Sequence, residues 1–189
     1  MTEHLVALGS NLPSDQGDPA ATLIRAIAEI GTHEAVTVSR TSHWYRTPAY
    51  PPGSGPDFVN GAAVIETALS AGEVLQLLHQ VERTFGRTRQ KRWAPRICDL
   101  DLLGAGDFVT PDPETVRQWI EIDPETAADQ APTELILPHP RLHERGFVLV
   151  PLAEIAADWK HPVLGVTVKE MLSRLPTADL AEIRALTPE

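Results

Sequence analysis

The sequence is poor in cysteine, in aromatic residues and in long apolar runs. Cys98 is the single cysteine among 189 residues, so no disulfide can form within the chain and we expect a cytoplasmic protein. The apolar runs are far shorter than the ~20 residues that a membrane-spanning helix needs, so we expect no membrane partner. Met1 to His4 carry no basic region of the kind that opens a signal peptide.

Two common nucleotide-binding motifs are also missing. The sequence contains no G-x-x-x-x-G-K-[ST] and no G-x-G-x-x-G pattern, which excludes a P-loop and a Rossmann site. Hydrophobic residues make up 42% and charged residues 22%, which is ordinary globular composition, and the length predicts a single domain over residues 1–189. The net charge of −10 argues against general binding of nucleic acid or anionic membranes.

The charge is unevenly distributed along the chain. Residues 83–96 contain six bases and no acid, whereas residues 107–134 contain eight acids and one base. A cationic segment within an acidic protein indicates a small polyanionic ligand rather than a long nucleic acid. We interpret the acidic stretch, at about 105–134, as a surface insertion and not as a domain of its own.

The hydrophobic pattern predicts an α+β fold. Apolar or β-branched runs predict strands at 4–8, 36–45, 58–65 and 97–103. Helical spacing follows Asp18-Pro19 and again follows Ser70, where Glu73 occupies the capping-box position. The order β-α-β-β-α-β is ferredoxin-like, an antiparallel sheet with helices on one face, and a C-terminal helical extension follows it.

Asp99 and Asp101 are the sharpest chemical feature of the sequence. Aspartate is depleted in strands, and two residues at i and i+2 share one face of a strand. Carboxylates held together in this way suit Mg²⁺, which takes one or two of them together with substrate phosphates. A solvated strand face would show the same pattern, so the metal interpretation stays open on this pair alone.

The basic segment directly precedes the aspartate pair. Arginine matches phosphate oxygens with two parallel hydrogen bonds, and a cationic loop beside paired carboxylates is the arrangement that phosphoryl transfer requires. A solvated loop is the alternative. Two further residues are ambiguous: His139, between two prolines, could contact phosphate or only shape a turn, and Asn60 could bind a heterocycle edge or only satisfy backbone.

Seven short segments occur in order along the chain: Gly9-Ser10-Asn11-Leu12, Tyr45-Arg46-Thr47-Pro48, Phe58-Val59-Asn60, Gly86-Arg87-Thr88-Arg89, Arg92-Trp93-Ala94-Pro95-Arg96, Asp99-Leu100-Asp101 and Pro138 to Phe147. Together they resemble 6-hydroxymethyl-7,8-dihydropterin pyrophosphokinase of folate biosynthesis. The resemblance covers roughly residues 4–158 and is most specific from Gly86 to Asp101.

The resemblance implies transfer of pyrophosphate from ATP, as co-substrate, to the pterin hydroxymethyl group, with release of AMP. It implies that Asp99 and Asp101 hold two Mg²⁺ ions and that Arg87 and Arg96 stabilise charge on the transferring group. On the ATP side it places Glu82, Arg89, Arg92, Leu102, His139 and Arg145. On the pterin side it places Thr47, Pro48, Phe58, Asn60, Trp93 and Phe147, with Trp93 on a closing loop. We therefore expect small-molecule partners only, no nucleic acid, and a monomer.

Two functions of other classes use the same features. The strand and helix order also suits a single-stranded RNA-binding module, although an aromatic content of 5% and the negative net charge argue against it. The paired carboxylates also suit a Mg²⁺-dependent nuclease, which would need bases spread along a groove rather than clustered. Titration with RNA oligomers, with a pterin and with a non-hydrolysable ATP analogue would separate the three.

Overall fold

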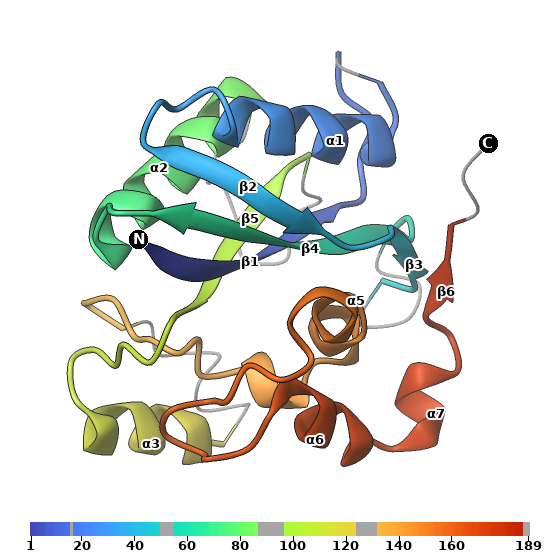
Figure 1. Ribbon diagram of the computed structural model, residues 1–189. Helices are drawn as coiled ribbons and strands as arrows, with labels where there is room; N and C mark the ends of the chain where they lie inside the picture. The colour runs from blue at the N-terminus through green and yellow to red at the C-terminus, as the bar shows by residue number, and fades with distance from the viewer. Residues whose placement is uncertain (16, 50–54, 87–96, 124–131, 187–189) are drawn as a thin grey trace.

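Six strands form one antiparallel sheet at the centre of the molecule (Figure 1). The computed structural model describes residues 1–189 apart from 16, 50–54, 87–96, 124–131 and 187–189. Neighbouring strands follow the order β5-β1-β4-β3-β6, and β2 also pairs with β4. The strands are β1 (Thr2–Ser10), β2 (Val36–Thr41), β3 (Tyr45–Thr47), β4 (Phe58–Thr67), β5 (Asp99–Ala105) and β6 (Arg184–Ala185).

The central strands β1 and β4 are buried on both faces. Leu5 and Val6 of β1 are both fully buried although they point to opposite sides of the sheet. The run from Val59 to Ile65 in β4 is buried without interruption. A strand that is apolar on both faces requires a covering layer on each side.

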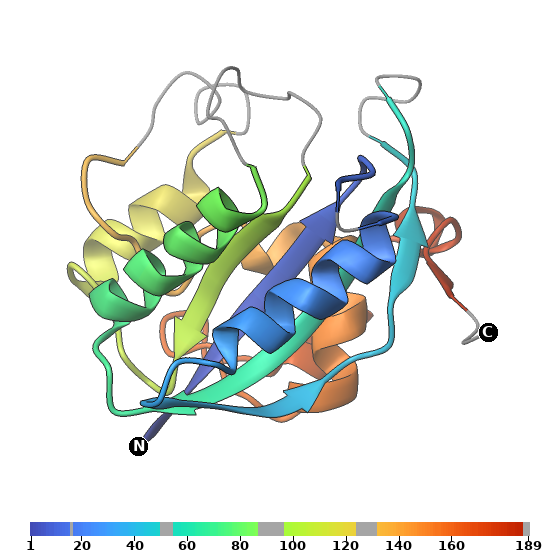
Figure 2. The same ribbon diagram turned by 90° about the horizontal axis from the view of Figure 1, so that it is seen from above.

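Helices α1 (Pro19–Ile30) and α2 (Ala71–Thr84) cover the first face and lie side by side across the strands (Figure 2). Asp18 caps α1 by accepting a hydrogen bond from the Ala21 N–H at 2.8 Å. Ser70 and Glu73 form the predicted capping box at the start of α2. Each helix buries one apolar stripe against the sheet, formed by Leu23, Ala26 and Ile30 and by Val74, Leu78 and Val81. Both predicted helices are confirmed.

Helices α1 and α2 share one face of the sheet, and the C-terminal helices cover the second face. Helix α5 (Gly146–Ala156) packs against β4, and α6 (Val168–Ser173) packs against α5 (Figure 1). The short helices η1 (Leu142–Glu144) and α7 (Thr177–Leu180) adjoin α5. The apolar residues of this layer are Leu5, Val64 and Leu103 on the sheet with Leu149, Leu152 and Met171 on the helices. Helices α5 and α6 therefore supply the cover that the second face requires.

The acidic segment after β5 folds back on itself. The backbones of Thr110 and Leu137 exchange two hydrogen bonds of 3.0 Å, so the two ends of the segment meet. Between them lies helix α3 (Pro113–Glu121), and its Val116 is fully buried. Within the described part of the chain, every helix is too short or too polar to cross a bilayer.

Candidate active site

Asp99 and Asp101 share one face of β5, as the sequence predicts. In the register with β1, Asp99 lies opposite Gly9 and Asp101 lies opposite Ala7. Both aspartates are partly exposed, whereas Leu100 between them is buried in the core under α1 and α2. Because side chains alternate along a strand, both carboxylates face the α5 side of the sheet.

The strand register extends this polar row across the sheet. Asn60 of β4 lies opposite Gly9 from the other side, so Asp99, Gly9 and Asn60 form one row over three strands. Gly9 keeps the row open, because a Cβ atom there would lie 3.1 Å from Asn60 Oδ1. A carboxylate and an amide therefore flank a strip of bare backbone on one sheet face.

Asn60 is held in a fixed orientation by its neighbour on β3. Asn60 is buried, and its Nδ2 donates a hydrogen bond of 2.7 Å to Oγ1 of the buried Thr47. Thr47 pairs with Phe58 in the strand register, which brings three of the predicted pterin residues together. Pro48, the next residue, is exposed. An oriented amide with one N–H already used keeps a second N–H and a carbonyl oxygen for a ligand.

His139 lies beside the aspartate strand as a neutral imidazole. Its backbone N–H donates to the Leu103 carbonyl of β5 at 2.8 Å, and the Arg141 N–H donates to its Nδ1 at 3.1 Å. Nδ1 is therefore an acceptor, which puts the ring proton on Nε2. Burial, followed by the nearby Arg145 charge, lowers the pKa of His139 to about 3. At neutral pH the ring can donate a hydrogen bond without adding positive charge.

Arg145 lies close to the aspartates and also contacts the Phe147 ring. Burial lowers the pKa of Arg145, while the negative charges of Asp101, Glu144 and Asp99 oppose that effect. Its Cζ atom lies 5.8 Å from the centre of the Phe147 ring, within cation–π range. Phe147 itself is 40% exposed in the first turn of α5. The described structure thus brings a cation and an exposed aromatic ring to the same face as the carboxylates.

Glu82 and Leu102 lie on the other side of β5. Glu82 is 2% exposed and its Oε1 accepts a hydrogen bond of 2.9 Å from the Leu100 N–H. This contact fixes the backbone of β5 between the two aspartates. The Leu102 side chain is buried in the core under α1 and α2, so a contact with nucleotide would use its main chain. The structure does not bring these two side chains to the aspartate face.

Five predicted site residues lie outside the described residues. They are Arg87, Arg89, Arg92, Trp93 and Arg96. The segment ends directly before β5, so the chain joins it to the aspartate strand. Their roles stay predictions.

Sequence reasoning missed a network that ties β3 to α5. Glu154 accepts a hydrogen bond of 2.8 Å from the His43 N–H and a further hydrogen bond from the Tyr45 hydroxyl. Burial, reinforced by Glu154, raises the pKa of Tyr45 to about 12. Nothing in the local pattern links Glu154 to residues more than a hundred positions earlier, and only the packing of α5 on the sheet brings them together.

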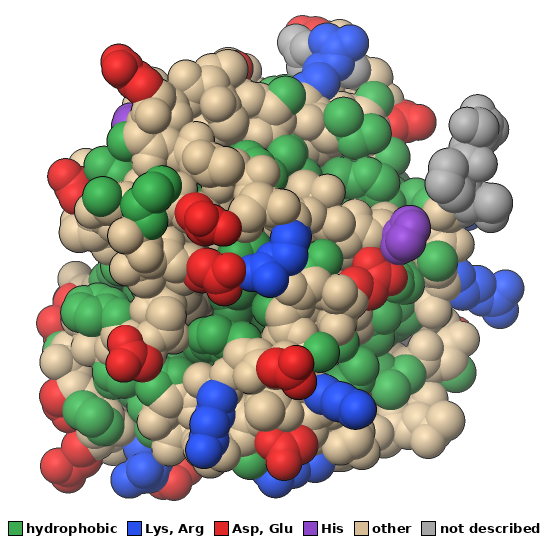
Figure 3. Space-filling model, in the orientation of Figure 1, with side chains coloured by type: hydrophobic (Ala, Val, Ile, Leu, Met, Phe, Trp, Pro, Cys, Tyr) green, Lys and Arg blue, Asp and Glu red, His purple; other side chains and the backbone are tan. Residues whose placement is uncertain are grey.

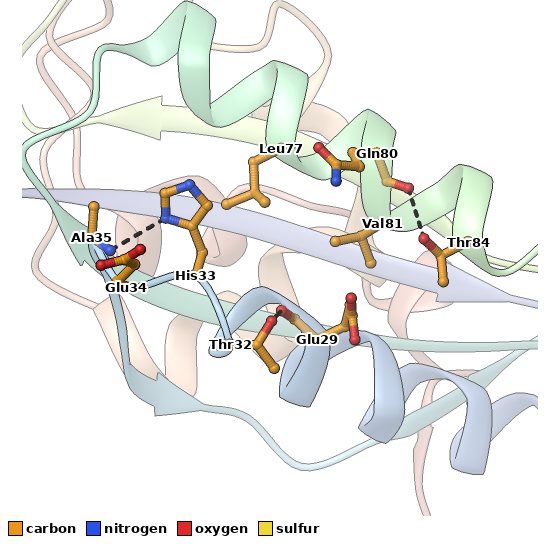
Figure 4. Close-up of a pocket in the computed structure, with 9 residues that line it drawn as sticks. All are labelled: Glu29, Thr32, His33, Glu34, Ala35, Leu77, Gln80, Val81 and Thr84. Atoms are coloured by element: carbon orange, nitrogen blue, oxygen red, sulfur yellow. Dashed lines mark hydrogen bonds between the residues drawn. The ribbon is translucent and has the colours of Figure 1, made fainter.

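A hollow of about 610 Å³ lies away from this site, between the C-terminal parts of α1 and α2 (Figure 4). His33, Glu29 and Thr84 line it. Their described hydrogen bonds are local: the Thr32 hydroxyl donates to the Glu29 carbonyl, and the Ala35 N–H donates to His33 Nδ1. These helices cover the face opposite to the aspartates, so the hollow is not part of the candidate site.

The aspartate pair fits a magnesium ion. Among the described residues, no three His, Cys, Asp or Glu side chains cluster in a way that could hold a metal. Mg²⁺ is usually held by only one or two carboxylates, with water and substrate phosphates completing its shell. Two partly exposed carboxylates on one strand face match this mode of coordination.

Comparison with known proteins places the chain among pterin pyrophosphokinases. The family model for 7,8-dihydro-6-hydroxymethylpterin-pyrophosphokinase matches residues 5–157. The 2-amino-4-hydroxy-6-hydroxymethyldihydropteridine pyrophosphokinase of Synechocystis sp. is 39% identical over 171 residues, which cover 90% of this chain and 75% of the relative. The protein of the same name from Bacillus subtilis is 40% identical over 150 residues, which cover 79% of this chain and 75% of the relative.

Solved structures agree at the level of the fold. The Plasmodium falciparum HPPK-DHPS structure with SDX-DHP matches with a TM-score of 0.62 and 14% sequence identity. The match covers 92% of this chain and 43% of that longer chain, so this chain spans less than half of it.

Proposed function

Because this chain belongs to the 7,8-dihydro-6-hydroxymethylpterin-pyrophosphokinase family, we propose that its polar sheet face is where the reaction takes place. The chain transfers pyrophosphate from ATP to the hydroxymethyl group of 6-hydroxymethyl-7,8-dihydropterin and releases AMP, in folate biosynthesis. One observation supports this location above the others. Asp99, which suits the metal and phosphates of ATP, and Asn60, which suits the pterin, lie in the same cross-strand row on either side of Gly9.

The chemistry requires positioning and charge neutralisation more than covalent help from the protein. The pterin alcohol oxygen bonds to the β-phosphorus of ATP while the bond from that phosphorus to the α-phosphate bridging oxygen breaks. Holding the two substrates in line lowers the entropic cost of bringing them together in the reactive geometry. Cations stabilise the negative charge that develops on the transferred group.

Residues around Asp99 and Asp101 form the phosphate side of the site. The two carboxylates would hold Mg²⁺, with two ions expected, and the bound metal would neutralise phosphate charge. Arg145 faces the aspartates as a cation and His139 offers a neutral donor. We assign Arg87 and Arg96 to the transferring group, and the remaining nucleotide contacts to Glu82, Arg89, Arg92 and Leu102.

Residues around Asn60 form the pterin side. The amide orientation set by Thr47 suits the donor and acceptor edge of a pterin ring. Phe58, two residues before Asn60, lies on the same face of β4, and Phe147 lies in the first turn of α5, which packs against that strand. We propose that the ring lies between these two phenylalanines, with backbone contacts from Thr47 and Pro48 and with Trp93 closing over it.

The same proposal extends to the whole molecule. We propose a ferredoxin-like fold, which the antiparallel pairing of β1 with β4 and β5 and of β2 with β4 supports, and one domain over residues 1–189 with an acidic insertion at about 105–134. On the face seen in Figure 3, acidic and basic side chains are interspersed rather than gathered into a basic patch. We also propose a monomeric cytoplasmic enzyme with small-molecule partners and without nucleic acid, and the net charge of −10 favours the last of these.

A coupled assay for AMP release tests the function. With ATP, Mg²⁺ and 6-hydroxymethyl-7,8-dihydropterin, AMP should form at a rate that depends on the pterin concentration. Omitting the pterin measures hydrolysis, and omitting Mg²⁺ tests the metal. Absence of pterin-dependent AMP, or a fluorescence response to RNA oligomers that matches the response to pterin, would overturn the proposal.

A further inference from the structure

The last described part of the chain returns to the pterin side of the site. Residues 177–186, here called the C-terminal strap, comprise α7, a short turn, β6 and Leu186. The strap lies beyond residues 5–157, which the family model matches. It contacts β3, which carries Thr47 on the proposed pterin side, and the start of α5, which carries Phe147 (Figure 1).

The first contact is with the outer edge of β3. Arg184 and Ala185 pair with Arg46 and Tyr45 of β3, and the Leu186 N–H donates to the Trp44 carbonyl at 2.8 Å. β3 has only three residues, and β4 is its other partner in the sheet. A strand this short frays at a sheet edge unless a second partner holds it.

The second contact is with Gly146, the first residue of α5. A Cβ atom at Gly146 would lie 3.0 Å from Cδ1 of Ile183 and 3.0 Å from Cδ2 of Leu180. At these distances the two terminal methyl groups would have to move by a few tenths of an ångström, so the strap packs directly on the glycine backbone. Gly146 stands between Arg145 and Phe147, and the strap therefore bears on the turn that presents both side chains.

Glu154 completes a closed set of connections. Through His43 and Tyr45 it ties the later turns of α5 to β3. The strap ties the first turn of α5 to the outer edge of the same strand. The Glu154 hydrogen bonds and the strap together fix the separation between Thr47 of β3 and the Arg145–Phe147 turn of α5.

We propose that the C-terminal strap is a positioning element that sets the width of the pterin pocket. This inference rests on the proposed function, since it assigns a role to the strap at the same site. The ring is proposed to lie between Phe147 of α5 and Phe58, which pairs with Thr47 of β3, so its binding requires a fixed spacing between α5 and the paired strands β3 and β4. Displacement by ~1 Å costs up to a hundredfold in rate. Leu180 and Ile183 act through Gly146 and need not touch substrate themselves.

Gly146→Ala tests the proposal by pushing a methyl group into the strap. We expect the KM for pterin to rise about tenfold, while the KM for ATP stays within about twofold. Gly72→Ala is the matched control: it makes the same change in α2, where no atom lies within 4 Å of the added Cβ. Combining Gly146→Ala with Ile183→Val and Leu180→Val removes the two opposing methyl groups and should restore most of the affinity for pterin.

Amide hydrogen exchange gives a readout that does not depend on activity. In Gly146→Ala, exchange at Tyr45 to Thr47 should speed up about tenfold, whereas Gly72→Ala should leave it unchanged. An unchanged pterin KM, an equal rise in both KM values, or failure of the compensating pair to rescue would each overturn the proposal. If the wild type formed no pterin-dependent AMP, the proposed function would fail, and exchange would still show whether the strap couples α5 to β3.

Discussion

Asp99 and Asp101 carry two carboxylates on one strand face. Their Cα atoms lie about 6.6 Å apart, from the rise of an extended strand. Arg145 faces them from the start of α5 and offsets part of their repulsion. One partly buried cation beside two carboxylates leaves a negative balance among these three side chains, which suits the proposed divalent metal. This residue-scale balance explains why a strand otherwise made of apolar residues tolerates the pair.

Asp99→Asn or Asp101→Asn should lower the rate of AMP release by at least about a hundredfold, because each would remove a charged ligand of the proposed Mg²⁺. The fold should persist, and the apo protein should be slightly more stable since the repulsion is relieved. Asp107→Asn is the control: it makes the same change at an exposed turn just beyond β5. Near wild-type rates in Mg²⁺ for either site variant would contradict the metal assignment.

Asn60→Ala should weaken pterin binding by about tenfold or more and leave ATP binding almost unchanged, as measured by calorimetry with each ligand. Thr47→Val separates two causes, because it removes the 2.7 Å bond that orients the amide but keeps the amide itself. We expect Thr47→Val to cost less than Asn60→Ala. Equal losses of pterin and ATP affinity would indicate general disruption and contradict the assignment.

At the scale of elements, helix α3 is connected to the phosphate side through Arg141. The Arg141 Nη1 donates to the Ile122 carbonyl at 3.1 Å, and its guanidinium pairs with Glu144. The Arg141 side chain is only 14% exposed. The acidic segment is therefore attached to the residues that lead from His139 to Arg145.

Arg141→Ala should lower the free energy of unfolding by about 1–3 kcal/mol, because it leaves a carbonyl and a carboxylate without their partner. Arg117→Ala, at an exposed position of α3, should change it by less than about 0.5 kcal/mol. Urea unfolding of both variants measures the difference. Similar values for the two arginines would show that the link from α3 contributes nothing to stability.

The basic segment before β5 gives a kinetic prediction at the same scale. Arg96→Ala should reduce kcat by about a hundredfold and change the KM for ATP much less, because its charge matters most when negative charge develops on the transferred group. Steady-state assays with each substrate varied would measure both constants. A loss confined to KM would instead make Arg96 a ground-state binding residue.

At the scale of the whole molecule, His161 makes stability depend on pH. It is fully buried, and its Nδ1 accepts hydrogen bonds of 3.2 Å from the Val163 and Leu164 N–H groups. Burial, followed by the charge of His143, lowers the pKa of His161 to about 4. Between pH 6.5, the ordinary value, and pH 4 the unfolded chain binds a proton that the folded chain does not.

The free energy of unfolding should therefore fall as the pH drops below 6.5, by about 2 kcal/mol at pH 5 from this group alone. His161→Asn keeps an acceptor near Nδ1 but cannot titrate, so its stability should depend less on pH by a similar amount. Urea unfolding at pH 7.5 and pH 5.0 checks both proteins. Identical pH dependence in the two would show that His161 does not take up the proton.

The sequence alone determined the features that depend on neighbouring residues. The helical stripes and the shared face of Asp99 and Asp101 follow from periods of 3.6 and two residues. The caps at Asp18 and Ser70 follow from the residue types that begin a helix. The order of motifs along the chain also indicated the family, to which the chain belongs. Each of these features is local or sequential, so it can be recognised without the packing of distant segments.

The tertiary structure decided what depends on distant segments. The strand register places Asp99, Gly9 and Asn60 in one row. The sequence of a single strand does not show which residues of the neighbouring strand lie opposite it. Both faces of β4 are buried, and the helices after residue 145 form the layer that covers the second face. The start of this layer places Arg145 and Phe147 beside the candidate site. The contact of the strap with Gly146 is of the same kind, because packing brings together residues that no sequence period relates.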